Sequence, residues 1–482
     1  MFLGLDLGTS GVKALLVDGE GRAIGSADAS YDVSNPAQGW SEQDPSDWVA
    51  GVKAALGALK AAHPKAFGAI QGLALSGHMH GAVLVDAAGD VLRPCILWND
   101  TRSHAQAATM DSDPRARAIS GNIVFPGFTA PKLAWIAENE PEVFARVSRV
   151  MLPKDYVVWW LTGRFATEMS DAAGTAWLDV GGRTWSDDLL ALGGMDAAQM
   201  PDLLEGTDVV GQVQPARADL GLPKTCKVIA GGADNAVAAC GVGALSEGQG
   251  FVSLGTSGVV LTGRDSYAPL ADSAVHTFCH AVPGRWYQMG VVLAATDSLN
   301  WLSKITGQSA TALSSALGNT LAAPDVVKFY PYLSGERTPH NDAAVRGSFT
   351  GLDVASDAST LASAVMAGVA FALRDSFEAI KATGATFETA LAIGGGSQSD
   401  YWTEMLATVL NIPLERPDES AFGAALGAAR IAMCGVTRAN PTEVMTKPPV
   451  ANIIHPQTNL VQAYEDAYAG FASAYPTLKA MP

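Results

Sequence analysis

The sequence contains the same six-residue segment twice, about half the chain apart. Leu7-Gly8-Thr9-Ser10-Gly11-Val12 recurs letter for letter as Leu254-Gly255-Thr256-Ser257-Gly258-Val259. Each copy follows one apolar run and precedes another, which predicts a strand, a tight turn and a second strand. Repetition of such a unit indicates two related α/β lobes. We place their boundary between residues 243 and 244, giving domains 1–243 and 244–482.

Apolar runs and capping residues predict the elements around these turns. Asp44 suits a helix N-cap and Pro45 the first helical position. Because a strand and not a helix follows the first turn, the opening is not a Rossmann unit. We expect strands over residues 2–7, 12–17, 22–30, 69–76, 82–85, 227–230 and 390–393, and helices from Asp44, from Asn235 and over about 360–383.

Composition excludes several classes of partner. A formal net charge of −17 argues against a nucleic-acid ligand, which requires a basic face. We find no apolar run of the length that a membrane helix needs and no signal-peptide pattern at the N-terminus, so no membrane partner is expected. The five cysteines are scattered without zinc or redox spacing, which favours free thiols in a reducing compartment and a cytoplasmic protein.

The paired Gly-Thr-Ser turns suit a phosphate chain. Successive turn N–H groups form an anion site, and the Thr and Ser hydroxyls add donors. As bare structure, each turn could be only a hairpin connection. Asp6 precedes the first turn, where the second lobe has Ser253. An acid beside a phosphate loop needs a cation between them, so Asp6 is a candidate Mg²⁺-site residue, the alternative being an ordinary strand-end aspartate.

A second acid, Asp234, follows Gly231-Gly232 where a strand gives way to a helix. It could serve as a general base for a hydroxyl that attacks a γ-phosphate, or it could simply cap the helix, and spacing alone leaves both open. Gly394–Ser397 is either a structural turn or a platform under a nucleoside. His78 and His80 lack a third metal ligand nearby, so they fit a polar pair lining a sugar pocket, with Trp98 as an aromatic face.

These segments together resemble the FGGY carbohydrate kinases, a family of the actin, hexokinase and sugar-kinase fold group. The stretch Gly127–Asn139 also resembles the signature of that family, and the resemblance extends from residue 1 to about 435. It is strongest to members that act on D-xylulose, through strings such as Trp40–Pro45, Ser170–Thr175 and Pro331–His340. The implied fold is α/β and two-lobed, actin/hexokinase-like (ribonuclease H-like), with duplicated domains and an interlobe cleft.

The resemblance implies a role for each matching position. The first lobe would bind sugar and carry Asp234 as catalytic base, with Asp6 also catalytic, and the second lobe would bind nucleotide. Both carboxylates, Asp6 and Asp234, would lie at Mg²⁺. The implied substrate contacts are Met79, His80, Trp98, Asp155, Asp234 and Asn235. The implied nucleotide contacts are Thr9, Ser10, Lys13, Gly255, Thr256, Gly395, Gly396 and Ser399, the last standing where relatives often have Asn.

The implied reaction is ATP-dependent phosphorylation of D-xylulose with Mg²⁺ as cofactor, and relatives are often homodimers. Three alternatives stay open. The substrate could be another sugar or polyol of the family, such as ribulose, fuculose or gluconate. The chain could be a catalytically silent sugar sensor, although Asp6 and Asp234 favour an enzyme. A chaperone- or actin-like ATPase would not need the Met79-His80 and Trp98 strings.

Overall fold

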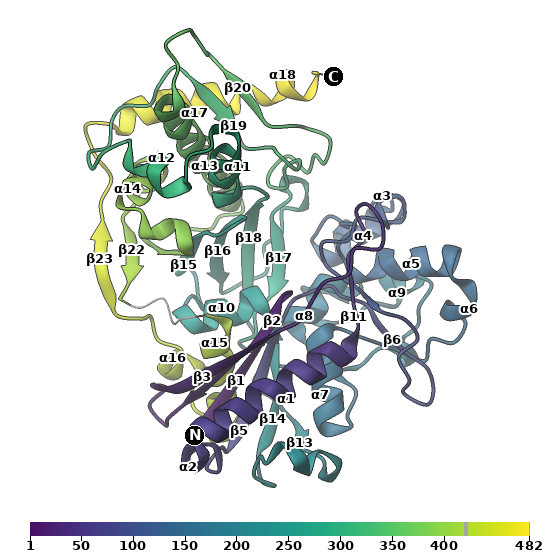
Figure 1. Cartoon of the computed structure of the whole chain (residues 1–482). Helices are drawn as coiled ribbons and strands as arrows, with labels where there is room; N and C mark the ends of the chain where they lie inside the picture. The colour runs from purple at the N-terminus through teal and green to yellow at the C-terminus, as the bar shows by residue number, and fades with distance from the viewer. Residues whose placement is uncertain (419–422, 482) are drawn as a thin grey trace.

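In the computed structural model of the chain, residues 1–418 and 423–481 are described. Within them two large β-sheets, of six and seven strands, form the centres of two lobes (Figure 1). The first sheet has the order β13-β14-β5-β1-β2-β3, and the second has the order β17-β18-β16-β15-β21-β22-β23.

The strands of the first sheet are β1 (Phe2–Leu7), β2 (Gly11–Val17), β3 (Ala23–Ser30), β5 (Gly72–Gly77), β13 (Val209–Gln212) and β14 (Lys227–Ala233). Those of the second are β15 (Gly250–Leu254), β16 (Gly258–Arg264), β17 (His276–Cys279), β18 (Trp286–Val292), β21 (Ala390–Ile393), β22 (Leu414–Pro417) and β23 (Val450–Ile454). Short pairs complete the strands: β4 (Glu42–Gln43) with β7 (Cys95–Ile96), β6 (Val83–Val85) with β8 (Arg149–Met151), β9 (Ala166–Glu168) with β12 (Asp202–Leu204), β10 (Leu178–Asp179) with β11 (Thr184–Trp185), and β19 (Lys328–Tyr330) with β20 (Ser348–Thr350).

The two sheets share one topology. In the first, β1 runs antiparallel to β2 and parallel to β5, which is parallel to β14. In the second, β15 runs antiparallel to β16 and parallel to β21, which is parallel to β22. Both sheets then end in an antiparallel strand, β13 or β23. The prediction of two related α/β lobes is therefore confirmed, and the repeated turns connect the corresponding strands of the two sheets.

The helices of the first half are α1 (Pro45–Ala62), α2 (Pro64–Phe67), α3 (His104–Asp111), α4 (Pro114–Ser120), α5 (Thr129–Asn139), α6 (Pro141–Phe144), α7 (Pro153–Thr162), α8 (Met169–Ala172), α9 (Asp187–Leu192) and α10 (Asp234–Val242). The helices of the second half are α11 (Thr296–Thr306), α12 (Ala310–Ser315), α13 (Ala358–Lys381), α14 (Asp400–Leu410), α15 (Ala424–Thr437), α16 (Pro441–Val444), α17 (Val461–Ala472) and α18 (Tyr475–Lys479).

Helix α15 crosses from the second half of the chain to the first sheet. It packs on β1, β5 and β14 and beside α10, and both helices lie between the two sheets (Figure 1). The contact is close because glycines remove side chains from it. A Cβ on Gly4 would lie 1.9 Å from the Ala425 carbonyl oxygen, and one on Gly427 would lie 1.9 Å from that of Val237. The boundary at residue 243 thus separates the sheets but leaves α15 against the first of them.

Helix α13 forms the centre of the second lobe. By length and composition it could cross a membrane, but 78% of its most apolar stretch is buried inside the protein. Val365, Val369 and Leu373 belong to the apolar core of that lobe. Burial of this kind identifies a core helix, whose apolar residues face neighbouring elements on all sides.

Most of the predicted elements are present, with one informative difference. β1 and β21 have the predicted bounds, and Asp44 caps α1 by accepting a hydrogen bond from the Ser46 N–H at 2.8 Å. The strand predicted to end at residue 230 instead continues to Ala233, because an irregular register between Ile229 and Gly232 absorbs the two glycines. Gly231 has φ of +87°, and a Cβ there would lie 1.9 Å from the Leu75 carbonyl oxygen. This bend directs Asp234 beyond the sheet.

Candidate active site

The carboxyl ends of three parallel strands bring the two predicted acids to one edge of the first sheet. β5 lies between β1 and β14, with Asp6 paired with Ser76 and Ser76 paired with Gly232. Asp234 begins α10 directly after β14. Ligands of open α/β sheets bind at this edge, where parallel strands end together.

Asp234 is held at the start of α10 without serving as its cap. Ala233 is the N-cap residue, and the Asp234 Oδ1 accepts hydrogen bonds from the Asn235 N–H at 2.7 Å and the Asn235 Nδ2 at 2.9 Å. Burial and the negative charge of Asp6 raise the pKa of Asp234 to about 7, while the Asn235 donors oppose this. A carboxylate with such a pKa can accept a proton at neutral pH.

Asp6 is partly buried at the end of β1. Burial raises its pKa, whereas the Ser76 hydroxyl and the charge of Lys13 lower it. Lys13 lies opposite Asp6 on β2 but is exposed, and its Nζ is 3.9 Å from the Asp28 carboxylate. The negative charge of Asp6 in turn raises the pKa of Asp234, and two acids at one sheet edge suit a bound cation.

The first Gly-Thr-Ser turn is fixed by side chains from three other segments. The Gly8 carbonyl accepts a hydrogen bond from the Tyr31 hydroxyl at 2.6 Å, and the Thr9 carbonyl accepts one from Gln43 Nε2 at 2.7 Å. Trp98 Nε1 donates to the Thr9 Oγ1 at 3.0 Å. The carbonyls of Gly8 and Thr9 are therefore already occupied by protein donors. Ser10, at the outer side of the turn, is exposed and open to a ligand.

The second turn is fixed by the start of α11. The Gly255 carbonyl accepts hydrogen bonds from the Thr296 N–H at 2.9 Å and the Thr296 Oγ1 at 2.8 Å. The Thr256 carbonyl accepts one from the Ala295 N–H at 2.9 Å. Thr256 and Ser257 themselves are exposed. The second turn thus resembles the first: its carbonyls are held by hydrogen bonds, and hydroxyl-bearing residues are exposed.

A pocket of about 620 Å³ adjoins the second turn, and Thr296 lines it as well as bonding the turn. Three predicted nucleotide residues, Gly395, Gly396 and Ser399, line the same pocket. The glycines bring the chain close to the turn, since a Cβ on Gly396 would lie 2.9 Å from the side chains of Leu254 and Thr296. The other lining residues are Leu299, Asn300, Ala310, Thr311, Ser314, Ser315, Gly318, Asn319, Gln398, Asp400, Tyr401 and Trp402.

Ser399 has a structural task in this pocket. Its hydroxyl caps α14 by accepting a hydrogen bond from the Trp402 N–H at 3.3 Å, and it lies 3.4 Å from the Ser314 hydroxyl. The two serines close one side of the pocket. A pocket with a polar rim, glycine backbone and the ring of Tyr401 can accept a flat ring and its sugar.

His80 and Met79 lie where the two lobes meet. His80 has φ of +70° and its Nδ1 is 2.7 Å from the Gly174 carbonyl oxygen, so its ring faces Gly174. The His80 ring stacks on Phe128 at 4.7 Å, and Tyr287 of the second lobe donates to the Met79 sulfur at 3.9 Å. Burial and the nearby Lys132 lower the pKa of His80 to about 3, which leaves a neutral imidazole.

The lysine of the segment 127–139 holds this turn. Lys132 is fully buried, and its Nζ donates to the carbonyls of His80 at 2.8 Å and Gly127 at 2.7 Å. Burial lowers its pKa to about 7. Lys132 therefore acts as a clamp that fixes the backbone of His80, and the exposed Trp98 lies beside Gly127.

Asp155 lies apart from these groups, in a buried ion cluster. The Lys154 Nζ is 2.5 Å from Asp155 Oδ1, 3.5 Å from Glu168 Oε1 and 3.4 Å from Asp171 Oδ2. Burial raises the pKa of Asp171, and the negative charge of Asp234 is among the smaller causes that raise it further. One cation thus neutralises part of a group of three acids behind the sheet edge.

Among residues 1–418 and 423–481, no group of three His, Cys, Asp or Glu side chains could hold a metal ion. His78 and His80 do not converge, since His78 packs edge-on against Trp48 at 5.5 Å. Asp6 and Asp234 both carry carboxylate oxygens, the kind of donor that Mg²⁺ prefers.

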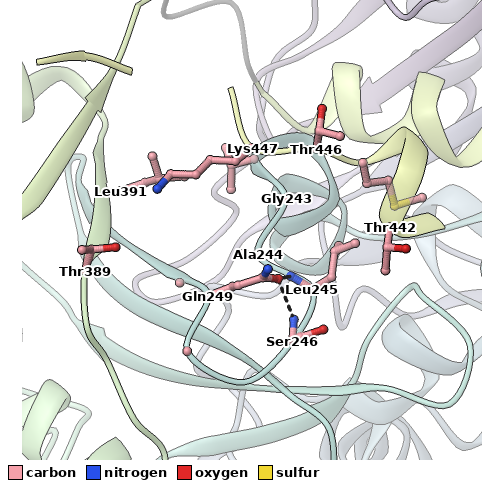
Figure 2. A pocket seen from close by; sticks show the side chains of 14 residues that line it. Gly243, Ala244, Leu245, Ser246, Gln249, Thr389, Leu391, Thr442, Thr446 and Lys447 are labelled. Atoms are coloured by element: carbon pink, nitrogen blue, oxygen red, sulfur yellow. Dashed lines mark hydrogen bonds between the residues drawn. The ribbon is translucent and has the colours of Figure 1, made fainter. Parts of the chain in front are cut away.

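A second pocket, of about 370 Å³, lies at the connection between the lobes and contains none of the predicted site residues. Figure 2 shows Gln249 and Ser246 in the lower part of the view, with Thr389 at the left and Lys447 at the top. The Gln249 Oε1 accepts hydrogen bonds from the Leu245 and Ser246 N–H groups at 3.1 Å each, which fixes the loop that leads into the second lobe.

Sequence reasoning missed several residues that build the site. Gln43, Tyr31 and Thr296 support the turns, and Ser170 and Arg337 lie near the acids and the His80 turn. Each of them acts through a contact distant in sequence, and Tyr31 and Thr296 carry no local signal. Gln43, Ser170 and Arg337 fall within strings that supported the family resemblance, which was the available hint.

Comparison with known proteins agrees with this architecture. Residues 1–241 match the family model described as FGGY family of carbohydrate kinases, N-terminal domain, and residues 250–436 match its C-terminal domain. The chain is 41% identical to a xylulose kinase of Escherichia coli (strain K12) and 42% identical to one of Klebsiella pneumoniae, each over 99% of both chains. It superposes on the crystal structure of a "xyloylose kinase" from Brucella ovis with a TM-score of 0.98 at 52% identity, covering 100% of both chains. A xylulose kinase structure from Rhodospirillum rubrum gives 0.92 at 28% identity, covering 99% of both.

Proposed function

Because the chain belongs to the FGGY family of carbohydrate kinases, we propose that it transfers the γ-phosphoryl group of ATP to D-xylulose. The observation that supports this most strongly is the likeness to xylulose kinases along nearly the whole chain. The products are D-xylulose 5-phosphate and ADP. The first lobe, residues 1–243, would bind the sugar and supply the base, and the second, residues 244–482, would bind the nucleotide.

Asp234 is the proposed general base. Its carboxylate takes the proton of the sugar O5 hydroxyl while the O5–phosphorus bond forms and the bond from phosphorus to the ADP oxygen breaks. A pKa of about 7 supports this role, since a substantial fraction of the group is ionised at neutral pH and can still hold a proton. Asn235 beside it keeps the carboxylate oriented through Oδ1.

Asp6 and Asp234 would hold Mg²⁺ together with phosphate oxygens, directly or through water. The negative charge of Asp6 raises the pKa of Asp234, and a cation between the two acids would offset this repulsion. When bound, Mg²⁺ neutralises charge on the transferring phosphoryl group. Lys13 stands opposite Asp6 and could reach a phosphate once it leaves Asp28.

The two turns would grip the phosphate chain from opposite lobes. Thr9 and Ser10 would contribute from the first turn, and Gly255 and Thr256 from the second. The adenosine would occupy the 620 Å³ pocket over Gly395 and Gly396. The Ser399 hydroxyl already caps α14, so Ser399 would contact the adenine ring at most at the edge of that ring.

Met79, His80 and Trp98 would contact the sugar, with Asn235 beside the base. The neutral His80 ring can donate or accept a hydrogen bond to a hydroxyl, and the Trp98 face suits the apolar face of a sugar. Asp155 would act from behind, by holding Lys154 in place. Water exclusion on sugar binding would limit ATP hydrolysis without transfer.

The reaction is tested by identifying the product. The purified protein, MgATP and D-xylulose labelled with ¹³C at C5 should give a new phosphate-ester resonance with phosphorus coupled to C5. Phosphate on another carbon would contradict the O5 assignment.

The five cysteines are free and buried, which supports our proposal of a reducing, cytoplasmic location. Light scattering tests whether the protein forms a homodimer, as the resemblance implied.

A further inference from the structure

The backbone around Arg337 in the second lobe is held by several hydrogen bonds. Arg337 lies between β19 and β20, where its own N–H donates to Glu336 Oε1 at 2.7 Å. The next residue is tied to the end of β18, since the Thr338 N–H donates to the Val291 carbonyl at 3.1 Å. Glu336 is bound in turn by the Leu293 N–H at 3.1 Å. The backbone of Arg337 is therefore fixed, and its side chain has a defined direction.

The guanidinium group of Arg337 reaches the first lobe. Its Cζ lies 4.5 Å from the ring centroid of Phe125. Phe125 packs edge-on against Phe128 at 5.5 Å, and Phe128 stacks on His80 at 4.7 Å. The positive charge of Arg337 also lowers the pKa of His80 and of His276. Arg337 thus lies beside the turn that carries Met79 and His80, but it comes from the opposite lobe.

The donors of this guanidinium are unused within residues 1–418 and 423–481. No side chain or carbonyl there accepts a hydrogen bond from it, and the neighbouring Glu336 carboxylate takes the backbone N–H instead. Burial lowers the pKa of Arg337 to about 10, so it remains a cation at neutral pH. Partly buried charged donors without partners are costly, and a planar fork of N–H groups at a ligand site is suited to paired oxygens.

The His80 turn that Arg337 approaches is connected to the residue before Asp234 through one short segment. The His80 Nδ1 lies 2.7 Å from the Gly174 carbonyl oxygen, and the Ser170 hydroxyl accepts a hydrogen bond from the Ala233 N–H at 3.0 Å. A ketose whose O5 lies at Asp234 would extend its other end, the C1 hydroxyl and C2 carbonyl, toward the His80 turn. These two oxygens are on adjacent carbons and match the spacing of a guanidinium fork.

We propose that Arg337 is a substrate-binding residue of the second lobe that donates hydrogen bonds to the C2 carbonyl and C1 hydroxyl of the ketose. This inference rests on the proposed function. It gives the second lobe a direct contact with the sugar and therefore links sugar binding to the approach of the two lobes. It also makes Arg337 a determinant of the choice between ketoses and sugars that lack oxygen at C1.

The test compares D-xylulose with 1-deoxy-D-xylulose in wild type, Arg337→Met and Arg337→Lys. Arg337→Met should raise the KM for D-xylulose about 10- to 100-fold, the range expected when charged hydrogen bonds are lost. The KM for ATP should change less than about twofold, because the nucleotide pocket is elsewhere. Wild type should prefer D-xylulose over the 1-deoxy sugar, Arg337→Met should lose most of that preference, and Arg337→Lys should recover part of it.

Two further variants separate sugar binding from a merely structural contact between lobes. Phe125→Leu removes the aromatic face but leaves the guanidinium, so it should retain the preference for D-xylulose. Arg374→Met removes a guanidinium that lies 4.2 Å from the Tyr468 ring and pairs with Glu465, and it should leave the KM for D-xylulose unchanged. Equal effects of Arg337→Met and Phe125→Leu, with the preference unchanged in both, would overturn the inference.

The same data distinguish this inference from the proposed function. Wild-type protein that fails to phosphorylate D-xylulose would contradict the proposed substrate. Active wild-type protein, with an Arg337→Met variant that keeps both the wild-type KM for D-xylulose and the wild-type preference for D-xylulose over the 1-deoxy sugar, would contradict only the role of Arg337.

Discussion

The hydroxyl of Ser170 accepts a hydrogen bond from the backbone N–H of Ala233 at 3.0 Å, one residue before Asp234. Ser170 in turn donates to Glu168 Oε2 at 2.7 Å, and that carboxylate caps α8 through the Ser170 and Asp171 N–H groups. Glu168 faces Lys154 at 3.5 Å. A buried polar chain therefore runs from Lys154 to the residue that precedes the proposed base.

Ser170→Ala should lower kcat through the position of Asp234. We expect a decrease of about 3- to 10-fold, the range that loss of one hydrogen bond spans, with the KM for ATP little changed. Steady-state kinetics measures it. The matched control is Thr408→Val, which removes a buried hydroxyl that accepts the Gln457 N–H at 3.0 Å at the far end of α14. A similar decrease of kcat in both variants would attribute the effect to general destabilisation.

Asp234→Ala should retain binding of sugar and nucleotide but lose most phosphoryl transfer. General-base catalysis contributes about 10²- to 10⁴-fold, so kcat should decrease by that factor. Calorimetric titration and single-turnover kinetics measure binding and transfer separately. Near-normal turnover of the variant would show that another group accepts the proton.

Gly395→Ala should weaken nucleotide binding without affecting the fold. A Cβ at Gly395 meets nothing within 4 Å in the protein, yet the residue lines the 620 Å³ pocket. The added methyl group should therefore occupy ligand space and raise the KM for ATP about tenfold. Gly57→Ala is the control, because a Cβ there also meets nothing within 4 Å, on the exposed side of α1. An unchanged KM for ATP in Gly395→Ala would place the nucleotide elsewhere.

Lys154→Met should destabilise the first lobe in a pH-dependent way. The variant leaves Asp155, Glu168 and Asp171 buried without their cation. The free energy of unfolding should therefore decrease by about 3–5 kcal/mol at pH 8. Lys154 lowers the pKa values of Glu168 and Asp171, so without it these values rise further above those of the unfolded chain. Groups with raised pKa values oppose folding less as the pH falls and they take up protons.

Urea unfolding of Lys154→Met at pH 8 and pH 6 measures this dependence, and the loss relative to wild type should be smaller at pH 6. If the variant does not fold at pH 8, the double variant with Asp171→Asn should recover folding, because it removes one of the buried charges. An equal loss at both pH values would contradict the electrostatic explanation.

Local patterns were sufficient to predict the parts of the fold that depend on neighbouring residues. The repeated turns, the Asp44 cap and the strand at Ala390–Ile393 each have a short-range cause, and all are present. The strand before Asp234 was predicted too short because two glycines usually end a strand, whereas here the register shift next to Leu75 requires them.

The remaining features depend on contacts between distant segments. α15 lies on the first sheet although its sequence belongs to the second half, since glycines such as Gly4 permit the close approach. The hydrogen bond between Ser170 and Ala233, which supports Asp234, joins residues 63 positions apart. The guanidinium of Arg337 meets Phe125 from the other lobe. No periodicity or turn chemistry in the sequence encodes such pairs, so the acids were predictable but their surroundings were not.

The most direct test of the proposed function is ADP release by the purified protein with MgATP, first without sugar and then with D-xylulose, ribulose, fuculose, gluconate and glycerol in turn. A D-xylulose kinase should release ADP slowly without sugar and should be stimulated more strongly by D-xylulose than by any of the others. Strong stimulation by a different sugar would contradict the proposed substrate while keeping the kinase chemistry. Bound nucleotide with no stimulation by any sugar would contradict the kinase itself and indicate a silent sensor.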